Sequence, residues 1–281
     1  MLDILWLAIL LGLYIGVIPV YIGMLPIDRF RNLDPKWMTF LLCFTVGVLL
    51  FLLIDLGAEA MEEADSFIAA MQVADTATGS VPALDMAIFD LLGLSLAPHA
   101  GYAILIFGLT LGLLGLVYVD ERIRVRVDTA SGEKLAWLIA LAIGLHNMGE
   151  GLAVGITVSA GVTALANSLI VGFALHNLSE GIAIIGPLAK SGELPSIKRL
   201  LGLGALAGAP TILGAYIGLT WFANSLAIFF FAIAAGAVLY VVVEVLAGLR
   251  KDGTSLNAWS LHGGVLAGIL VMYVTSLFVA L

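Results

Sequence analysis

Eight apolar segments, separated by polar loops, run along this 281-residue chain. They cover about residues 3–26, 37–60, 100–119, 135–158, 163–187, 197–220, 224–249 and 260–281. Since a helix rises 1.5 Å per residue, each segment is long enough to cross about 30 Å of hydrocarbon. Only 11% of the residues are charged, whereas a soluble domain has about a quarter. The pattern predicts an all-α integral membrane protein, in which residues 1–281 form a single domain of eight transmembrane helices embedded in a lipid bilayer.

The lysine and arginine residues fall only in alternate loops, which indicates the direction of each segment. They form four groups: Arg29, Arg31 and Lys36; Arg122, Arg124, Arg126 and Lys134; Lys190, Lys198 and Arg199; and Arg250 and Lys251. Cytoplasmic loops of membrane proteins are enriched in basic residues. We therefore expect four cytoplasmic loops, both termini on the extracytoplasmic side, and a location in the cell membrane, of inner-membrane type. A missed or additional helix would disturb this alternation, so it also supports the count of eight.

The longest polar stretch, about residues 61–99, lies on the outer side and contains acidic residues but no basic residue. One interpretation is a solvated loop with a short interfacial helix near residues 85–96. Another is an acidic funnel that concentrates cations at an entrance. The net charge of −8 leaves no basic patch for a nucleic-acid partner. The single cysteine, Cys43, excludes a disulfide or a thiolate cluster within the chain.

One short motif occurs twice, on consecutive segments. Residues 145–155 read LHNMGEGLAVG, and residues 175–186 read LHNLSEGIAIIG. The two segments cross the membrane in opposite directions, and each motif lies near the middle of its segment. Repeats of opposite orientation that meet at the membrane midplane are typical of transporters.

In each motif the histidine and the glutamate are four residues apart and therefore share one helix face. If the two faces meet, they bring together two imidazoles, two carboxylates and two amides, from His146, Asn147, Glu150, His176, Asn177 and Glu180. Divalent ions such as Zn²⁺, Fe²⁺ and Mn²⁺ accept this mixture of nitrogen and oxygen ligands, and no thiolate is present to select a softer ion. The sequence therefore predicts a site for a divalent ion of the zinc, iron, manganese or cadmium type, bound as a substrate and not as a cofactor.

Ionised side chains at the bilayer centre cost roughly 2.5–3.5 kcal/mol each, so the two glutamates need a compensating charge, which a divalent cation supplies. A different interpretation is that each histidine–glutamate pair only ties helices together. Two other functions stay open: an intramembrane metal-dependent hydrolase, in which zinc activates water, and a proton-coupled carrier of an organic solute. Against the hydrolase, the chain contains no HExxH pair and no serine nucleophile elbow.

The eight-segment plan and the paired HN motifs resemble the ZIP (Zrt/Irt-like) family of divalent-metal transporters. The resemblance spans essentially the whole chain and is most specific at the two motifs. It implies a ZIP-like bundle, alternating access, and transport toward the cytoplasm. The ligands that it implies are His146, Asn147, Glu150, Asn177, Glu180 and, where many members also have histidine, His176. It further implies metal contacts near the entrance or the exit, at Asp55, Glu59 and Glu244.

Three positions depart from the family pattern. Ala209 stands where many members have a glutamate, and Leu49 stands where some bacterial members offer a methionine ligand. Ser179 stands where proline is common. Without the first two ligands, we expect one principal metal position and not a binuclear centre. Pairs of glycines four residues apart indicate packing seams, and the sequence leaves open whether one of them serves a homodimer.

Overall fold

Nearly all of the described chain is helical. The computed structural model describes residues 2–74, 85–87, 99–124, 131–190, 195–221, 223–251 and 258–280. Within these ranges there is no β-strand, and eight helical stretches are long and apolar enough to span a membrane. The predicted all-α fold with eight membrane spans is therefore confirmed.

Two of the eight spans are interrupted. The first consists of α1 (Leu2–Gly12), a π-helical turn η1 (Leu13–Val17), α2 (Ile18–Met24) and α3 (Ile27–Phe30). The sixth consists of α9 (Ile197–Gly208) and α10 (Pro210–Thr220). The other spans are α4 (Pro35–Ala74), α6 (Ala100–Arg124), α7 (Ser131–Ser159), α8 (Thr163–Lys190), α11 (Asn224–Lys251) and α12 (Ala258–Ala280). A proline lies at each interruption, Pro19 in the first span and Pro210 in the sixth.

The second span, α4, continues well beyond the apolar segment that marks it in the sequence. Its 40 residues correspond to about 60 Å of helix, twice the hydrocarbon thickness of about 30 Å. The sequence suggests an end near residue 60 because acidic residues begin there. Alanine, glutamate and methionine are nevertheless good helix formers, and the helix reaches Ala74. Of the helix expected near residues 85–96, residues 85–87 are helical, and the remainder lies outside the described residues.

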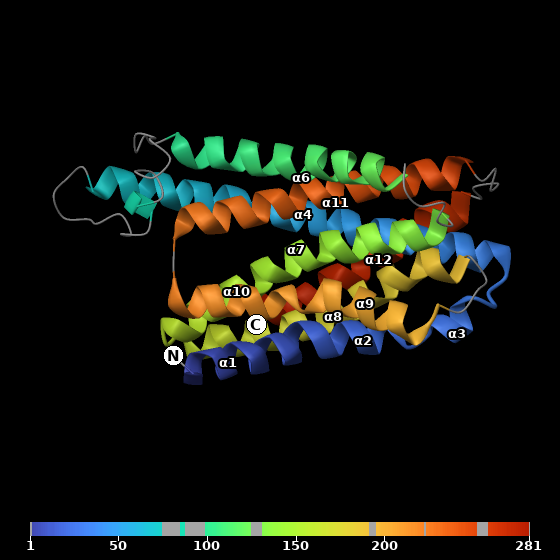
Figure 1. Cartoon of the computed structure of the whole chain (residues 1–281), viewed down its shortest axis with the longest axis horizontal. Coiled ribbons are helices and arrows are strands. Elements are labelled where there is room, and N and C mark those ends of the chain that lie inside the picture. Colours follow the sequence, from blue (N-terminus) through green and yellow to red (C-terminus); the bar gives the residue numbers. More distant parts are fainter. Residues whose placement is uncertain are drawn as a thin grey trace.

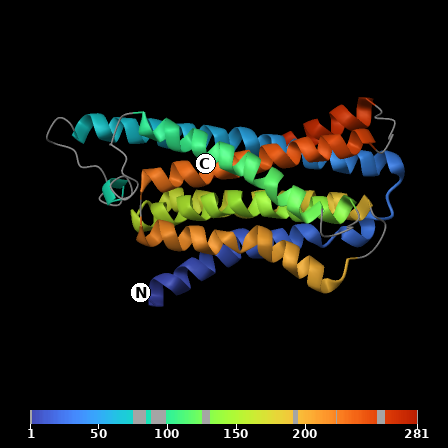
Figure 2. The same cartoon turned by 45° about the horizontal axis from the view of Figure 1, so that its top comes forward.

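The helices form two groups that meet along one interface (Figures 1 and 2). One group contains α1, α2 and α7 to α10, in which α10 packs on α7 and α2 packs on α8. The other contains α4, α6, α11 and α12, in which α11 packs on α6 and α4, and α12 packs on α4. The groups meet where α11 contacts α7 and where α4 and α12 contact α8. This interface places α7 and α8, which carry the two motifs, at the centre of the bundle.

Glycines allow helices within each group to approach until their backbones touch. Four of the glycine pairs with four-residue spacing face helices of this same chain: Gly108 and Gly112 face α11, Gly204 and Gly208 face α2 and η1, Gly214 and Gly218 face α7, and Gly264 and Gly268 face α4. A Cβ added at Gly214 would overlap the carbonyl oxygen of Met148. The seams therefore serve packing inside the chain.

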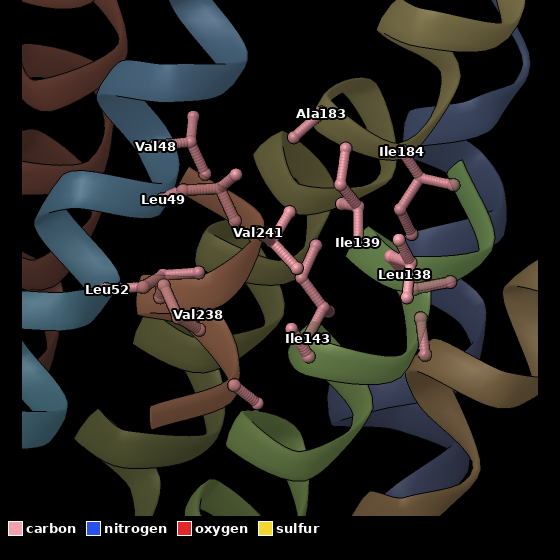
Figure 3. Packing of buried hydrophobic residues seen from close by; sticks show 14 of the residues in the cluster. Val48, Leu49, Leu52, Leu138, Ile139, Ile143, Ala183, Ile184, Val238 and Val241 are labelled. Atoms are coloured by element: carbon pink, nitrogen blue, oxygen red, sulfur yellow. The ribbon is translucent and has the colours of Figure 1, made fainter. Parts of the chain in front are cut away.

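A layer of buried aliphatic side chains joins the two groups (Figure 3). This aliphatic layer contains Val48, Leu49 and Leu52 of α4, Leu138, Ile139 and Ile143 of α7, Ala183 and Ile184 of α8, and Val238 and Val241 of α11. Its α7 members precede His146 in a helix that starts at the basic end of the bundle. Its α8 members follow Glu180 in a helix that runs toward that end. The aliphatic layer therefore separates the two motifs from the end of the bundle that carries the basic residues.

We predict that Gly214→Ala lowers the thermal stability of the purified protein, because the added methyl group would force α10 away from α7. Overpacking of this kind costs about 1–3 kcal/mol. Gly248→Ala is the matched control, since a Cβ at this helical glycine would meet no atom within 4 Å. Thermal unfolding in one detergent measures both variants, and an equal effect of the two substitutions would contradict the proposed close packing.

Candidate metal centre

The two motifs face each other where α7 and α8 run antiparallel and in contact. His146 and Glu150 on α7, and His176 and Glu180 on α8, are each at most 3% exposed. Gly149 lets Phe231 of α11 pack directly against this part of α7, since a Cβ at residue 149 would lie only 2.5 Å from Cε1 of Phe231. This close packing contributes to the burial. The helix contacts thus hold four ionisable side chains in one enclosed volume in the middle of the bundle.

Four potential ligand atoms converge in this volume. Nε2 of His146 lies 3.4 Å from Oε1 of Glu150 and 3.5 Å from Oε1 of Glu180. The same Glu180 oxygen lies 3.7 Å from Nε2 of His176. The two imidazole rings are 5.6 Å apart between their centroids. One glutamate oxygen therefore stands between two imidazoles that belong to different helices.

These separations suit a transition-metal ion with little movement of the side chains. Nitrogen and oxygen ligands lie about 2.0–2.2 Å from zinc, so two ligands of a tetrahedral ion are about 3.3–3.6 Å apart. Both distances from His146, 3.4 and 3.5 Å, fall in this range, and the 3.7 Å distance from His176 is close to it. Ligand atoms of His146, Glu150 and His176 also all lie within 4.8 Å of one another.

The two asparagines are anchored to the backbone of neighbouring spans. Nδ2 of Asn177 donates to the carbonyl oxygen of Ile15 in η1 at 3.1 Å and to Oε2 of Glu150 at 2.7 Å. Nδ2 of Asn147 donates to the carbonyl oxygen of Ala207, near the end of α9, at 3.1 Å. Both asparagines are fully buried. Each amide therefore links the centre to one of the two interrupted spans.

Several polar atoms of the centre are buried without a hydrogen-bond partner in the described part of the chain. They are both ring nitrogens of each histidine, Oε1 of Glu150, both carboxylate oxygens of Glu180, and the amide oxygens of Asn147 and Asn177. Burial of a polar atom without a partner is costly. Carboxylate and amide oxygens offer only lone pairs, and an imidazole offers a lone pair when neutral. A cation is therefore the kind of ligand that this arrangement fits.

Acidic residues of α4 lie beside the centre. Asp55 and Glu59 are close enough to His146 to interact with it electrostatically. Asp55 is half-buried and Glu59 is exposed. Farther along α4, Glu63 accepts a hydrogen bond from Nδ2 of Asn224, at the start of α11, at 3.3 Å. Acidic side chains thus occur at intervals along α4, from Glu63 to Asp55 beside the two motifs.

The structure does not bring Glu244 into the centre. It is half-buried on α11, and roughly 20 Å of helix separates it from Phe231, the residue of α11 that packs against Gly149. Leu49, at the position of a methionine ligand in some related proteins, is part of the aliphatic layer. Ala209 lies between α9 and α10 and offers no side-chain ligand.

Backbone groups at the two helix interruptions are the part of the centre that sequence reasoning missed. The signal that could have revealed them is a proline inside an apolar segment, Pro19 or Pro210. Because proline lacks an N–H, it leaves carbonyl groups of the preceding turn without a helical donor. Buried carbonyls of this kind need another donor, which a nearby asparagine can supply.

Comparison with known proteins gives an independent line of information. Residues 98–276, more than half of the chain, match the profile of the family described as ZIP Zinc transporter. The chain is 30% identical to human Zinc transporter ZIP10 over 160 residues, which is 51% of this chain and 18% of that protein. It is 26% identical to human Zinc transporter ZIP6 over 165 residues, 55% of this chain and 22% of that protein. It is also 26% identical to Zinc transporter foi of Drosophila melanogaster over 147 residues, 51% and 20% respectively. The matches thus span only about a fifth of the length of these relatives.

We predict that the purified protein binds one Zn²⁺ ion tightly, and not a pair. His146, Glu150, His176 and Glu180 form one cluster, joined by contacts of 3.4–3.7 Å between their ligand atoms, while Leu49 and Ala209 provide no further ligand. Isothermal titration with Zn²⁺ in detergent, combined with elemental analysis after gel filtration, gives the number of ions per chain. Two tightly bound ions per chain would contradict the prediction.

Proposed function

Since this chain belongs to the ZIP family of zinc transporters, we propose that it carries a divalent transition-metal ion across the membrane through the centre between α7 and α8. The observation that carries this proposal is the convergence of His146, Glu150, His176 and Glu180 within the bundle, with distances of 3.4–3.7 Å between their ligand atoms. Zinc is our first choice of substrate because the relatives are named zinc transporters. The nitrogen and oxygen ligands suit Fe²⁺, Mn²⁺ and Cd²⁺ as well.

The ligand set supports the reversible binding that transport requires. Two carboxylates balance the charge of one divalent ion, which offsets the cost of holding either partner away from water. The two asparagine oxygens add neutral ligands that do not alter this balance. In a site of this kind, the bound ion and its principal ligands together carry no net charge inside the membrane.

The aliphatic layer favours a transport mechanism by alternating access rather than by an open pore. Its residues from α4, α7, α8 and α11 are buried and pack against one another (Figure 3). Their positions along α7 and α8 place them between the centre and the basic end of the bundle. A hydrated or partly hydrated ion cannot pass such a layer while the side chains remain packed. We propose that α7 and α8 move relative to α4 and α11 to open this side, which is consistent with the division of the helices into two groups.

The acidic residues of α4 supply the proposed route from the outside. Asp55 and Glu59 lie beside His146, and Glu63 lies farther toward the outer end of the helix. Side chains of one sign along a route raise the local concentration of the opposite ion. Glu244 lies on the far side of the aliphatic layer from the centre, so we propose it as a contact at the exit.

The alternative of an intramembrane hydrolase has no support from the comparisons, since the matched family consists of transporters. A metal hydrolase also keeps one coordination position open for water. Here contacts of 3.4–3.7 Å join the ligand atoms of two carboxylates and two imidazoles, and four such ligands can fill the positions of a tetrahedral ion. Ion movement without hydrolysis of any substrate therefore fits the centre better, and competition among divalent ions would separate it from carriage of an organic solute.

We propose that both termini lie on the extracytoplasmic side. The support is that all lysines and arginines fall in alternate loops, and cytoplasmic loops are the basic ones. A reporter enzyme that is active only outside the cytoplasm, fused to the C-terminus in a bacterial host, should be active. A fluorescent protein that matures only in the cytoplasm should remain dark in the same position, and the reverse result would overturn the orientation.

We predict that His146→Ala and Glu150→Ala each reduce zinc uptake into proteoliposomes to the level of empty vesicles. Each substitution removes a ligand from the centre but also removes a buried ionisable group, so the fold should tolerate it. His262→Ala is the matched control, because this histidine is exposed on α12 and lies away from the centre. Uptake of radioactive zinc, corrected for the amount of inserted protein, is the measurement. Normal uptake by either ligand variant would rule out this centre as the transport site.

A further inference from the structure

The π-helical turn in the first span exposes a backbone carbonyl to the metal centre. In a regular helix the carbonyl of Ile15 would accept a hydrogen bond from the N–H of residue 19, but residue 19 is proline and has no N–H. The π-helical pairing of Ile18 N–H with the carbonyl of Leu13 shifts the ladder at the same place. Nδ2 of Asn177 donates to the Ile15 carbonyl at 3.1 Å. A motif residue on α8 thus supplies the donor that the first span lacks.

The sixth span shows a related arrangement at the other motif. Its helix is interrupted at Pro210, and Ala207 lies in the last turn of α9, where carbonyls have no further helical donors. Nδ2 of Asn147 donates to the Ala207 carbonyl at 3.1 Å. The two interruptions also touch each other, because a Cβ at Gly208 would lie 3.0 Å from the carbonyl oxygen of Gly16.

These bonds determine which way each amide points. The partners of the Asn177 amide are a carbonyl oxygen and the Oε2 atom of Glu150, and both can only accept. The NH₂ group must therefore face them, which leaves the amide oxygen on the other side. That oxygen has no hydrogen-bond donor among the described residues, and the same holds for the amide oxygen of Asn147. Both oxygens keep their lone pairs available for an ion.

We propose that Pro19 and Pro210 are positioning residues for the metal centre. Pro19 removes the N–H that would pair with the Ile15 carbonyl. Pro210 acts less directly: its own missing N–H would pair with Leu206, and it interrupts the helix so that Ala207 lies in the last turn of α9. The Ile15 and Ala207 carbonyls then fix the amides of Asn177 and Asn147, so that each amide oxygen is presented to the ion. The inference rests on the proposed function, since it assumes that the ion binds between α7 and α8. It assigns a role in substrate binding to two residues that do not contact the ion.

Another proline in the bundle provides a matched control. Pro187 lies inside α8 and removes the helical donor for the carbonyl of Ala183. This carbonyl accepts a hydrogen bond from Oγ1 of Thr45 on α4 at 3.3 Å. The chemistry of the released carbonyl is the same as at Ile15, but Thr45 is not part of the metal centre. Pro187→Ala therefore changes a released carbonyl and leaves the asparagine amides in place.

The experiment measures the affinity for Zn²⁺ by isothermal titration of the full-length protein in detergent. Pro19→Ala restores an N–H that competes with Asn177 for the Ile15 carbonyl. We expect the affinity to fall about tenfold, which is the lower end of the effect of losing a partner of a metal ligand. Pro187→Ala should leave the affinity within twofold of that of the unmodified protein.

A double-mutant cycle separates positioning from a general effect on the fold. Asn177→Ala alone should weaken binding, and adding Pro19→Ala to it should cause no further loss, because the amide that Pro19 positions is absent. Equal losses from Pro19→Ala in both backgrounds would overturn the proposal, as would no loss in either. If Pro19→Ala does not fold, the cycle of Pro210→Ala with Asn147→Ala provides the test, because joining α9 to α10 would let the N–H of Thr211 compete with Asn147 for the Ala207 carbonyl. Absence of Zn²⁺ binding by the unmodified protein would instead reject the proposed function itself.

Discussion

Two carboxylates buried in the middle of a membrane bundle are the constraint on which the rest of this structure depends. Glu150 and Glu180 are almost completely removed from solvent, and no lysine or arginine lies within their own apolar segments, residues 135–158 and 163–187, to balance them. Imidazoles, amides and a divalent ion are the remaining means of compensation. The antiparallel contact of α7 and α8 holds these groups close to one another. The interrupted spans behind it fix the two asparagines beside them.

The surroundings of the centre differ on its two sides. On one side, Asp55 and Glu59 of α4 lie close enough to His146 to interact with it electrostatically. Toward the basic end, the aliphatic layer closes the bundle where α4 and α11 meet α7 and α8 (Figure 3). Acidic residues on one side and an apolar closure on the other agree with the proposed route, in which the ion approaches along α4 and the aliphatic layer closes the opposite side. In the proposed transport cycle, opening that side would require the aliphatic side chains to repack.

Much of the fold was predictable from the sequence, because continuous apolar segments and alternate basic loops are strong signals. The pairing of the motifs followed from their opposite directions. The extension of α4 to Ala74 was not predictable from hydropathy, since acidic residues end the apolar segment without ending the helix. The hydrogen bonds of Asn147 to Ala207 and of Asn177 to Ile15 could not be predicted either, because they depend on distances between spans that are far apart in the sequence.

The near-symmetry of the metal centre has a consequence for direction. The helices α7 and α8 each contribute a histidine, an asparagine and a glutamate in the same sequence order, and the two helices run in opposite directions. An ion that arrives from either side of the membrane therefore encounters an equivalent set of ligands. Such a centre favours neither direction by itself. The acidic path and the aliphatic layer can change how fast an ion arrives or leaves, but they cannot set the equilibrium. For a divalent ion that crosses without a compensating charge, the membrane potential supplies that bias, about 4.6 kcal/mol per 100 mV.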